Sequence, residues 1–463
     1  MSPPKRSQRL RWMHTAHRWL ALIVGLQIGL WAISGAYMVM VDLDIIHGNH
    51  LIDPQRHPLQ PDDLPLVNKQ IQLVKEDFSS VISLKSQRHS LGQAYWVNQG
   101  NSAEASMASV FESPPLTEAH IRLLATTIYS GTASVSSSRL ITKDGPREYG
   151  SRALPVWQIQ FDDGWQTTLY LHPVSGQLIT KRHRLWRWFD FFWMLHIMDY
   201  QDRDNPHNLL LQIVGLFSLG VVLSGSVYLG LRLKQANARR LFKLRGDRVS
   251  FIHRLLGLII GAQLILWVVS GLLLSIIDPP PRLAAVPESP PQNADWVDIT
   301  QITSLIDEAI YSITLKTIHQ TPVYQLELSE KVLMVRTSDG KPFKLTQSHA
   351  LKLAHQQLGL SAPVTVSQRS SGTEQEELRL DYDDDEATTV TFSAANDYRL
   401  KRQNQRSRWR DLLFTLHFMD YMSTSNQSDF NHLLIRIAAL LTLVFAFSGW
   451  ILMIRQRRRL SLR

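Results

Sequence analysis

Four long apolar runs constrain this chain more than any other feature of its sequence. They cover residues 19–41, 209–231, 254–277 and 433–454. Each is long enough, at about 20 residues or more, to cross the roughly 30 Å of hydrocarbon in a bilayer as a helix. A single segment in lipid satisfies its own backbone hydrogen bonds only as a helix. We therefore predict four membrane-spanning helices. We expect the first to be retained, because its apolar run is too long for a cleaved signal peptide.

The distribution of basic residues predicts how these helices are oriented. The chain has 49 Lys and Arg against 40 Asp and Glu, which gives a net charge of +9. The excess lies in the N-terminal segment 1–18, the loop 232–252 and the C-terminal segment 455–463, which four crossings place on one side. The positive-inside rule makes that side cytoplasmic. We interpret these clusters as topology signals rather than a nucleic-acid site, and expect a multi-pass inner-membrane protein with its large regions in the periplasm.

Several short blocks of the sequence occur twice and in the same order. His17-Arg18 recurs as His253-Arg254, and the two apolar runs that follow align without a gap. The block Leu195–Tyr200 recurs as Leu416–Tyr421, and a serine–glycine step recurs in each matched pair of spans, at positions 34–35 and 270–271, and at 224–225 and 448–449. We interpret the chain as a duplication of two spans each. Such parallel repeats are related by a pseudo-twofold axis along the membrane normal.

The segments between the spans predict two α+β regions outside the membrane, residues 43–183 and 279–404. Alternating polarity and turn residues indicate paired strands, and other stretches have helical patterns. The strand pairs are expected at 156–171, 323–335 and 378–392, and the helices at 117–129 and 348–359. Each region is followed by an amphipathic segment, 184–206 or 405–430, that leads into the next span.

The first of these regions carries a family resemblance. The sequence Val156-Trp-Gln-Ile-Gln-Phe, with Asp162-Asp-Gly and Leu169-Tyr-Leu-His-Pro-Val-Ser-Gly after it, resembles the end of a PepSY module. With the Arg-Trp-Phe-Asp and Leu-His blocks and the spans opened by His-Arg, nearly the whole chain resembles the PepSY-associated transmembrane family. The resemblance implies a membrane α-helical bundle, four transmembrane helices duplicated 2+2, with two α+β PepSY-like extracytoplasmic domains. Members of that family include inner-membrane reductases of ferric siderophores that hold b-type haems between their helices. Haem b and a ferric siderophore or other periplasmic electron acceptor are therefore implied.

Four histidines at the ends of the spans are candidate axial ligands of haem iron. The chain has no cysteine, which excludes thiolate-held clusters and covalent haem attachment. His17 and His253 open the first and third spans, while His196 and His417 precede the second and fourth. One iron cannot join residues on opposite faces of a bilayer. We therefore expect His17 to pair with His253 and His196 with His417, to hold two haems.

Neighbouring residues are candidates for supporting roles. His207 and His432 miss pairing in the repeat by one position and are reserve ligands. Asp199 and Asp420 follow the outer histidines by three residues and are expected to accept a hydrogen bond from an imidazole. Small and aromatic residues complete the predicted site: Gly25, Gly35, Gly261 and Gly271 leave room for a macrocycle or a helix, and Trp186, Trp188, Phe189, Phe192 and Trp193 wall the outer site or form an aromatic belt.

These features predict a di-haem b electron carrier of the membrane, a haem-dependent oxidoreductase. The sequence has no glycine-rich dinucleotide fingerprint, so its electrons are expected from quinol or from a separate cytoplasmic reductase. One alternative is a membrane-anchored PepSY binding or regulatory protein without redox activity. Another is a transporter, which the absence of charge in the middle of the spans disfavours. A third is a Zn²⁺ or Fe³⁺ site made by the outer His and Asp residues.

Overall fold

The computed structural model of the chain divides into two units, which we name the membrane unit and the sheet unit. The membrane unit comprises Met1–Ile46, Leu185–Pro280 and Arg406–Arg463, and the sheet unit comprises His47–Arg184 and Pro281–Gln405. The structure describes residues 6–53, 57–76, 83–88, 94–99, 116–235, 247–279, 296–319, 321–329, 331–360, 362–371, 375–393, 398–421 and 432–461. Parts of the predicted basic loop and of the second amphipathic segment, 405–430, therefore lie outside the described residues.

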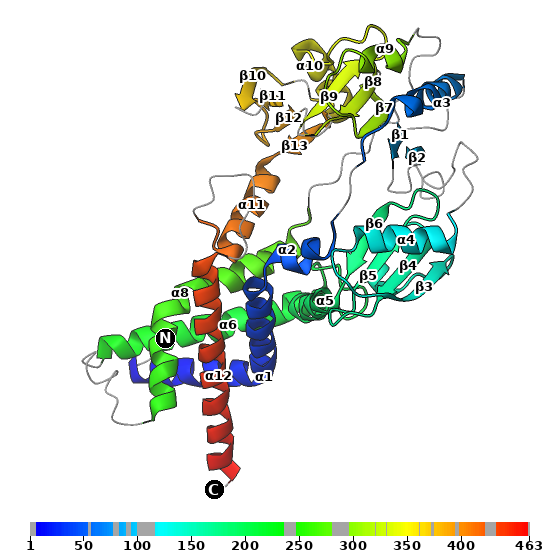
Figure 1. Cartoon of the computed structure of the whole chain (residues 1–463). Coiled ribbons are helices and arrows are strands. Elements are labelled where there is room, and N and C mark those ends of the chain that lie inside the picture. The colour runs from blue at the N-terminus through cyan, green and yellow to red at the C-terminus, as the bar shows by residue number, and fades with distance from the viewer. Residues whose placement is uncertain are drawn as a thin grey trace. The chain divides into compact units, whose positions relative to one another are not determined.

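Among the described residues, four helices are long and apolar enough to cross a membrane. They are α1 (Arg6–Met40), α6 (Leu209–Gln235), α8 (Arg248–Ile276) and α12 (Leu433–Ser461), all in the membrane unit (Figure 1). One end of each helix lies within one residue of the predicted end of its span. At the other end, the helix extends beyond the span into the adjacent basic segment. Helix α1 packs against α6 and α12, and α8 packs against the same two helices. The chain is thus a multi-pass membrane protein.

Polar side chains within the spans bond to the ends of neighbouring helices. Arg436, one turn inside α12, donates from Nε to the carbonyl of Val39 in α1 at 3.2 Å. At the sequence-matched position in the first half, Gln212 of α6 donates to the carbonyl of Ser275 in α8 at 2.8 Å. The last carbonyls of a helix have no partner in that helix and form the negative end of its dipole. A charged group one turn inside a span is therefore satisfied by the protein itself.

Two shorter helices, α5 (Arg184–Ile197) and α11 (Gln405–Phe418), carry the outer histidines. The last carbonyls of α5 accept hydrogen bonds from two residues of α1 and from the residue before α6: Gln27–Leu195 at 3.1 Å, Trp31–His196 at 2.8 Å and Asn208–Ile197 at 2.9 Å. In α11, Gln263 donates to the carbonyl of Leu416 at 3.4 Å. Met198 and Met419 then turn the chain, each with a φ of 55°. These contacts fix where each outer histidine lies.

Two aromatic residues of α5, Trp188 and Phe192, contact each other, and Phe192 also contacts helix α1. Phe192 packs on Tyr37 of α1 with ring centroids 4.5 Å apart, and Trp188 stacks on Phe192 at 6.0 Å. Trp188 and its sequence-matched counterpart Trp409 keep 49% and 55% of their surfaces exposed. Such exposed tryptophans favour the aromatic-belt interpretation for this position.

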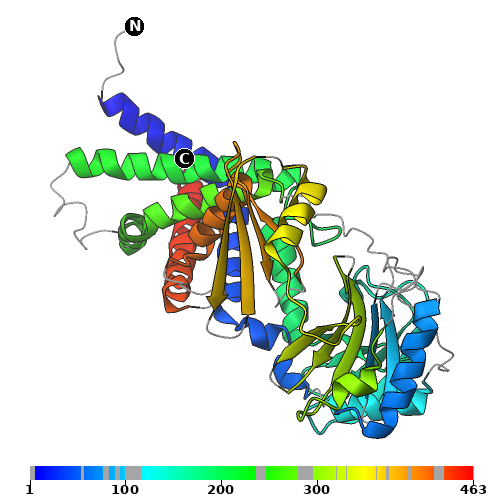
Figure 2. The same cartoon turned by 90° about the horizontal axis from the view of Figure 1, so that it is seen from above.

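The sheet unit contains a five-stranded sheet built from both predicted outer regions. Its order is β2-β1-β7-β8-β9, and every neighbouring pair is antiparallel. The blue strands of the first region lie beside the yellow-green strands of the second (Figure 2). The strands are β1 (Ser83–Arg88), β2 (Ala94–Gln99), β7 (Ser312–Ile318), β8 (Thr321–Glu327) and β9 (Val332–Arg336). Helices α3 (Leu64–Glu76) and α9 (Ile299–Thr303) contribute Val67, Ile71 and Ile299 to the core that contains Leu315 and Leu326.

This sheet corrects the predicted division of the outer regions into two separate domains. Residues 43–183 and 279–404 were expected to fold as separate domains. Strand β1 of the first region instead pairs with β7 of the second, with Ser83 opposite Lys316 and Gln87 opposite Ser312. Because the two regions share both a hydrogen-bonded sheet and a hydrophobic core, they form one unit.

Each region also contributes a helix followed by a four-stranded antiparallel sheet in sequential order. The first consists of α4 (Glu118–Ile128), β3 (Val135–Ile141), β4 (Val156–Phe161), β5 (Thr168–Leu171) and β6 (Leu178–Arg182). The second consists of α10 (Gln347–Leu358), β10 (Val364–Ser371), β11 (Gln375–Tyr382), β12 (Thr389–Ser393) and β13 (Lys401–Gln403). Both predicted helices and all three predicted strand pairs are found. The remaining short helices are α2 (Leu43–Ile46) and the 3-10 helices Asn49–Leu51, Pro61–Asp63 and Arg147–Tyr149.

The central turns of these two sheets have the same construction. The carboxylate of Asp163 accepts the Thr167 N–H at 2.8 Å, and that of Asp384 accepts the Thr388 N–H at 2.6 Å. The residue before each threonine has a positive φ, 52° at Gln166 and 47° at Ala387. The matching letters, Asp-Asp, three residues and Thr-Thr, are a sequence signal for this turn that pattern reading missed.

We predict that Asp163→Ala destabilises the folded chain by about 2–3 kcal/mol, because it leaves buried donors without an acceptor. Asp163 also accepts from the Tyr129 hydroxyl at 2.8 Å. Burial, together with Asp163, raises the pKa of Tyr129 to about 12, so this hydroxyl is a donor at neutral pH. Thermal unfolding of the full chain in detergent measures the change. The control is the exposed neighbour Asp162. The free energy of unfolding of Asp162→Ala should stay within about 0.5 kcal/mol of the parent. Equal losses in both variants would contradict the role of Asp163 as the acceptor in this turn.

Candidate functional site

Two pairs of histidines meet inside the membrane unit. His17 of α1 lies beside His253 of α8, with ring centroids 6.4 Å apart and ring planes at 45°. His196 of α5 lies beside His417 of α11, with centroids 6.3 Å apart and planes at 77°. Each pair takes one histidine from each sequence-matched half. The structure therefore brings together the four residues that the sequence singled out, in the predicted pairs.

The Nδ1 atom of each ring has a hydrogen-bond partner on a neighbouring helix. Three of the rings place Nδ1 3.0 Å from a serine hydroxyl, in the pairs His196–Ser34, His417–Ser270 and His253–Ser448. These serines also donate to the carbonyl three residues earlier in their own helices. A hydroxyl has one hydrogen, so a serine that gives it to the carbonyl of its own helix accepts a hydrogen bond from the Nδ1–H of the ring. Nδ1 of His17 lies 2.9 Å from the carbonyl of Val221, which can only accept. Nε2 therefore keeps its lone pair for a metal.

A glycine beside each serine brings the helix backbone close to the ring. A methyl group on Gly225 would lie 2.9 Å from Cε1 of His17, and the corresponding distances to Cε1 are 3.2 Å for Gly449–His253, 3.2 Å for Gly271–His417 and 3.6 Å for Gly35–His196. Gly35 and Gly271 thus lie against imidazole rings, a contact that the sequence did not predict. Gly25 and Gly261 do not: a methyl group there would meet Met453 and Trp450, or Ser226 at 4.0 Å.

The outer pair is held in the neutral state that metal binding requires. Burial lowers the pKa of His196 to about 3, and repulsion from His417 adds to the effect. Burial lowers the pKa of His417 to about 4. At neutral pH each ring therefore has one protonated nitrogen, which the serine contacts identify as Nδ1.

The spacing of the rings fits one metal ion between the members of each pair. With a metal–nitrogen bond of about 2.0–2.1 Å and about 1.1 Å from that nitrogen to the ring centroid, two imidazoles on opposite sides of one ion have centroids about 6.2–6.4 Å apart. The observed separations are 6.4 and 6.3 Å. Neutral imidazoles whose Nδ1–H is hydrogen-bonded are also the usual metal-binding form. The donor set therefore fits haem iron held by a histidine on either side.

Three of the residues expected to support the site have other partners. Asp199 accepts backbone N–H groups from residues 201, 202, 204 and 205, and these bonds lower the pKa of its carboxyl, the bond from Asn205 most. It organises the loop before α6, while Ser34 holds His196. His432 uses both ring nitrogens, Nε2 toward the Phe418 carbonyl at 3.1 Å and Nδ1 toward the Ile435 N–H at 3.3 Å. His207 points Nδ1 at the Ser275 carbonyl at 3.2 Å.

The role of His432 has a counterpart in the first half. Asn208 also caps its helix, accepting the Leu211 N–H at 2.9 Å, and it donates to the carbonyl of Ile197, the residue after His196. His432 binds the carbonyl of the residue after His417 in the same way. His432 is therefore corrected from a reserve ligand to a helix-end contact, and His207 lies at the end of α8 rather than in either histidine couple. Among the described residues, no hydrogen bond joins Asp420 to His417, so a role for Asp420 at the ring is not supported.

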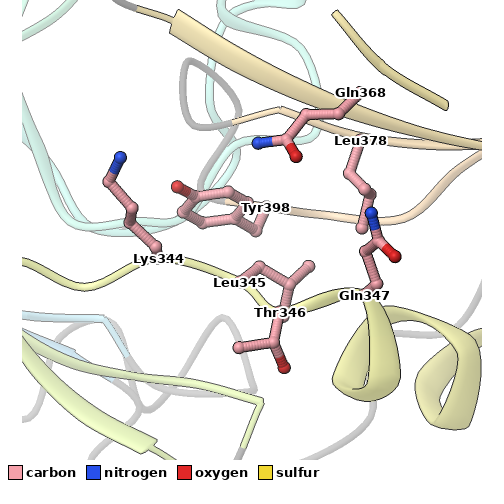
Figure 3. Close-up of a pocket in the computed structure, with 7 residues that line it drawn as sticks. All are labelled: Lys344, Leu345, Thr346, Gln347, Gln368, Leu378 and Tyr398. Carbon is pink, nitrogen blue, oxygen red and sulfur yellow. The ribbon is translucent and has the colours of Figure 1, made fainter.

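Other places in the described part of the chain offer poorer chemistry for a metal. No group of three or more His, Asp or Glu there is arranged to hold one, which removes the support for a Zn²⁺ or Fe³⁺ cluster at the outer histidines. A cavity of about 230 Å³ lies in the sheet unit beside the start of α10, and its lining includes Lys344, Gln347, Gln368 and Tyr398 (Figure 3). The cavity is lined by neither imidazole nor carboxylate.

Comparison with known proteins agrees with the resemblance seen in the sequence. The family model described as the PepSY-associated TM region matches residues 14–304 and again residues 252–463. The two matches together cover the four spans and both histidine pairs. No curated protein matches the chain. This chain therefore belongs to the PepSY-associated transmembrane family.

Proposed function

We propose that this protein is a di-haem b electron carrier that passes electrons across the inner membrane to an acceptor in the periplasm. The observation that carries the proposal is the pair of histidine couples, at 6.4 and 6.3 Å, each with Nδ1 engaged and Nε2 available. His17 and His253 would hold the inner haem, and His196 and His417 the outer one. Bound haem supplies an iron that takes up and gives back one electron.

The protein's own residues hold and orient these ligands. Serines 34, 270 and 448 and the carbonyl of Val221 fix the tautomer and the direction of each imidazole. The glycines let the rings sit close to the neighbouring helix. Since outer-sphere electron transfer moves no proton at the protein, no acid–base residue is required.

The orientation, the donor and the acceptor belong to the same proposal. The basic segments favour an inner membrane with both termini in the cytoplasm, which places His17 and His253 toward that side. Quinol or a cytoplasmic reductase would then give the electrons. The family resemblance favours a ferric siderophore as the acceptor, whose Fe³⁺ takes one electron and becomes Fe²⁺. The matched halves, and the repeated helix and sheet with its shared turn, support a duplicated ancestor with two PepSY-like modules.

The alternative function is that of a membrane-anchored binding or regulatory protein. The five-stranded sheet that both halves build would suit such a role. That account, however, gives no reason for four histidines to lie in two couples at the spacing of one metal ion. We therefore prefer the redox proposal.

An absorption spectrum is the direct test. The full chain, expressed in a host supplied with iron and haem precursor and purified in detergent, should have a b-type spectrum that changes on reduction with dithionite. Extraction of the haem should give about two per chain, one for each histidine couple. Purified, folded protein without colour would end the redox proposal and leave the binding protein as the better reading.

A further inference from the structure

Each candidate haem ligand rests on a serine–glycine step of another helix, and the four contacts are not alike. His253, His196 and His417 reach a serine oxygen at 3.0 Å. His17 instead reaches the carbonyl of Val221 at 2.9 Å, and Ser224, which stands where the other serines stand, donates to that same carbonyl at 3.0 Å. Ser224 therefore competes with His17 for an acceptor, whereas the other three serines are themselves acceptors.

This difference affects how strongly each imidazole binds iron. A hydrogen bond from Nδ1–H to an acceptor makes the opposite nitrogen a more basic ligand. More basic ligands favour Fe³⁺ over Fe²⁺ and so lower the reduction potential. A peptide carbonyl is a stronger hydrogen-bond acceptor than a serine hydroxyl oxygen. His253 and His417 each also have a carbonyl within reach, that of Phe445 at 3.3 Å from His253 and that of Trp267 beside His417. The difference between the two sites therefore rests on His17, which reaches a carbonyl, and His196, which reaches a serine.

We infer that these four serines are positioning residues that set the potentials of the two haems, with the His17–His253 site the lower of the two. The inference rests on the proposed function. An electron that enters at the lower-potential site then moves to the His196–His417 site with a fall in free energy, since ΔG = −nFΔE. The donor loses one electron and the outer acceptor gains it, with no bond made or broken at the protein.

The inference predicts shifts of opposite sign from the same chemical change. In the Ser34→Ala/Ser270→Ala double variant, His196 loses its serine acceptor and His417 keeps only the Trp267 carbonyl, so the outer haem should be reduced at a higher potential. In the Ser224→Ala variant, His17 no longer shares the Val221 carbonyl, so the inner haem should be reduced at a lower potential. We expect up to about a tenfold change in the reduction equilibrium, or about 59 mV for one electron.

A spectroscopic redox titration of purified, haem-loaded protein measures both waves. The Ser34→Thr/Ser270→Thr variant keeps the hydroxyls and should restore the parent potential. Ser218→Ala is the matched control, because Ser218 is a fully buried serine of α6 whose hydroxyl has no partner among the described residues. It should shift neither wave.

The outcomes separate this inference from the function beneath it. Opposite shifts, with rescue by threonine, support the inference. Full haem content with unmoved potentials, or shifts of the same sign in all alanine variants, overturns it while the haem carrier stands. If the double alanine variant loses haem, Ser224→Ala alone decides by the sign of its shift. Parent protein that binds no haem ends the proposed function itself.

Discussion

Alanine at His17 or at His253 is expected to remove one haem and leave the other. The two rings of that couple lie 6.4 Å apart and have one place for iron between them. Without one imidazole, the site would lose one of the two residues that hold the haem iron, and its affinity for haem would fall. The haem content per chain should fall to about half, and one of the two redox waves should disappear. Alanine at His196 or His417 should remove the other wave.

The controls for this result are the two histidines that sequence pairing left in reserve. His432 bonds the Phe418 carbonyl and caps α12, so His432→Gln should keep both haems and reduce thermal stability alone. His207→Ala should also keep both. Loss of the same wave from His17→Ala and His196→Ala would mean that the couples are assigned wrongly. Full haem content in all four alanine variants would mean that these residues are not ligands.

Gly225→Ala is expected to disrupt the inner haem, although alanine is the better helix former. The new methyl group would lie 2.9 Å from Cε1 of His17 and 3.0 Å from its Nδ1. The ring is held at Nδ1 by the Val221 carbonyl, so it cannot move without losing that bond. We expect reduced haem content or a changed spectrum confined to the inner site. Haem analysis and low-temperature spectra of the purified variant measure this.

The matched control is Gly35, which lies near the C-terminal end of α1, whereas Gly225 lies in α6. A methyl group on Gly35 would lie 3.6 Å from His196, which is an ordinary contact. Both substitutions improve intrinsic helix propensity by about 1 kcal/mol, so weakening of a helix explains neither result. Gly35→Ala should therefore keep both haems. Gly271 and Gly449, with 3.2 Å each, should fall between the two. Equal effects of Gly225→Ala and Gly35→Ala would contradict the close-approach role.

Much of the membrane unit was predictable from the sequence because lipid imposes a local requirement. A span must be apolar over the bilayer thickness, whatever it packs against. The repeat then identified the four histidines and their pairs without coordinates. In the sheet unit, alternating polarity and turn residues predicted the hairpins around residues 162–164 and 381–386, because strand pairs joined by short turns are local too.

The predictions from sequence were wrong or incomplete where a polar side chain has several possible hydrogen-bond partners. Asp199 was near His196 in sequence, but four backbone N–H groups lie nearer to its carboxylate in space. When the two halves are aligned, His432 lies one position away from His207 and directly opposite Asn208, whose capping role it shares. Ser34 was noted as a marker of the repeat, yet nothing in a single sequence tells that its oxygen lies on Nδ1 of His196.

The sequence by itself determined four spans, two matched halves and two couples of histidines, since burial in lipid and repetition leave marks on neighbouring letters. Only the tertiary structure decided which nitrogen of each ring is engaged, that Ser224 differs from the other three serines, and that β1 pairs with β7. These depend on residues far apart in the chain, such as His17 and Val221, which are separated by 204 positions. Contacts of that kind are decided when helices and strands pack, by distances of a few tenths of an ångström that no local pattern encodes.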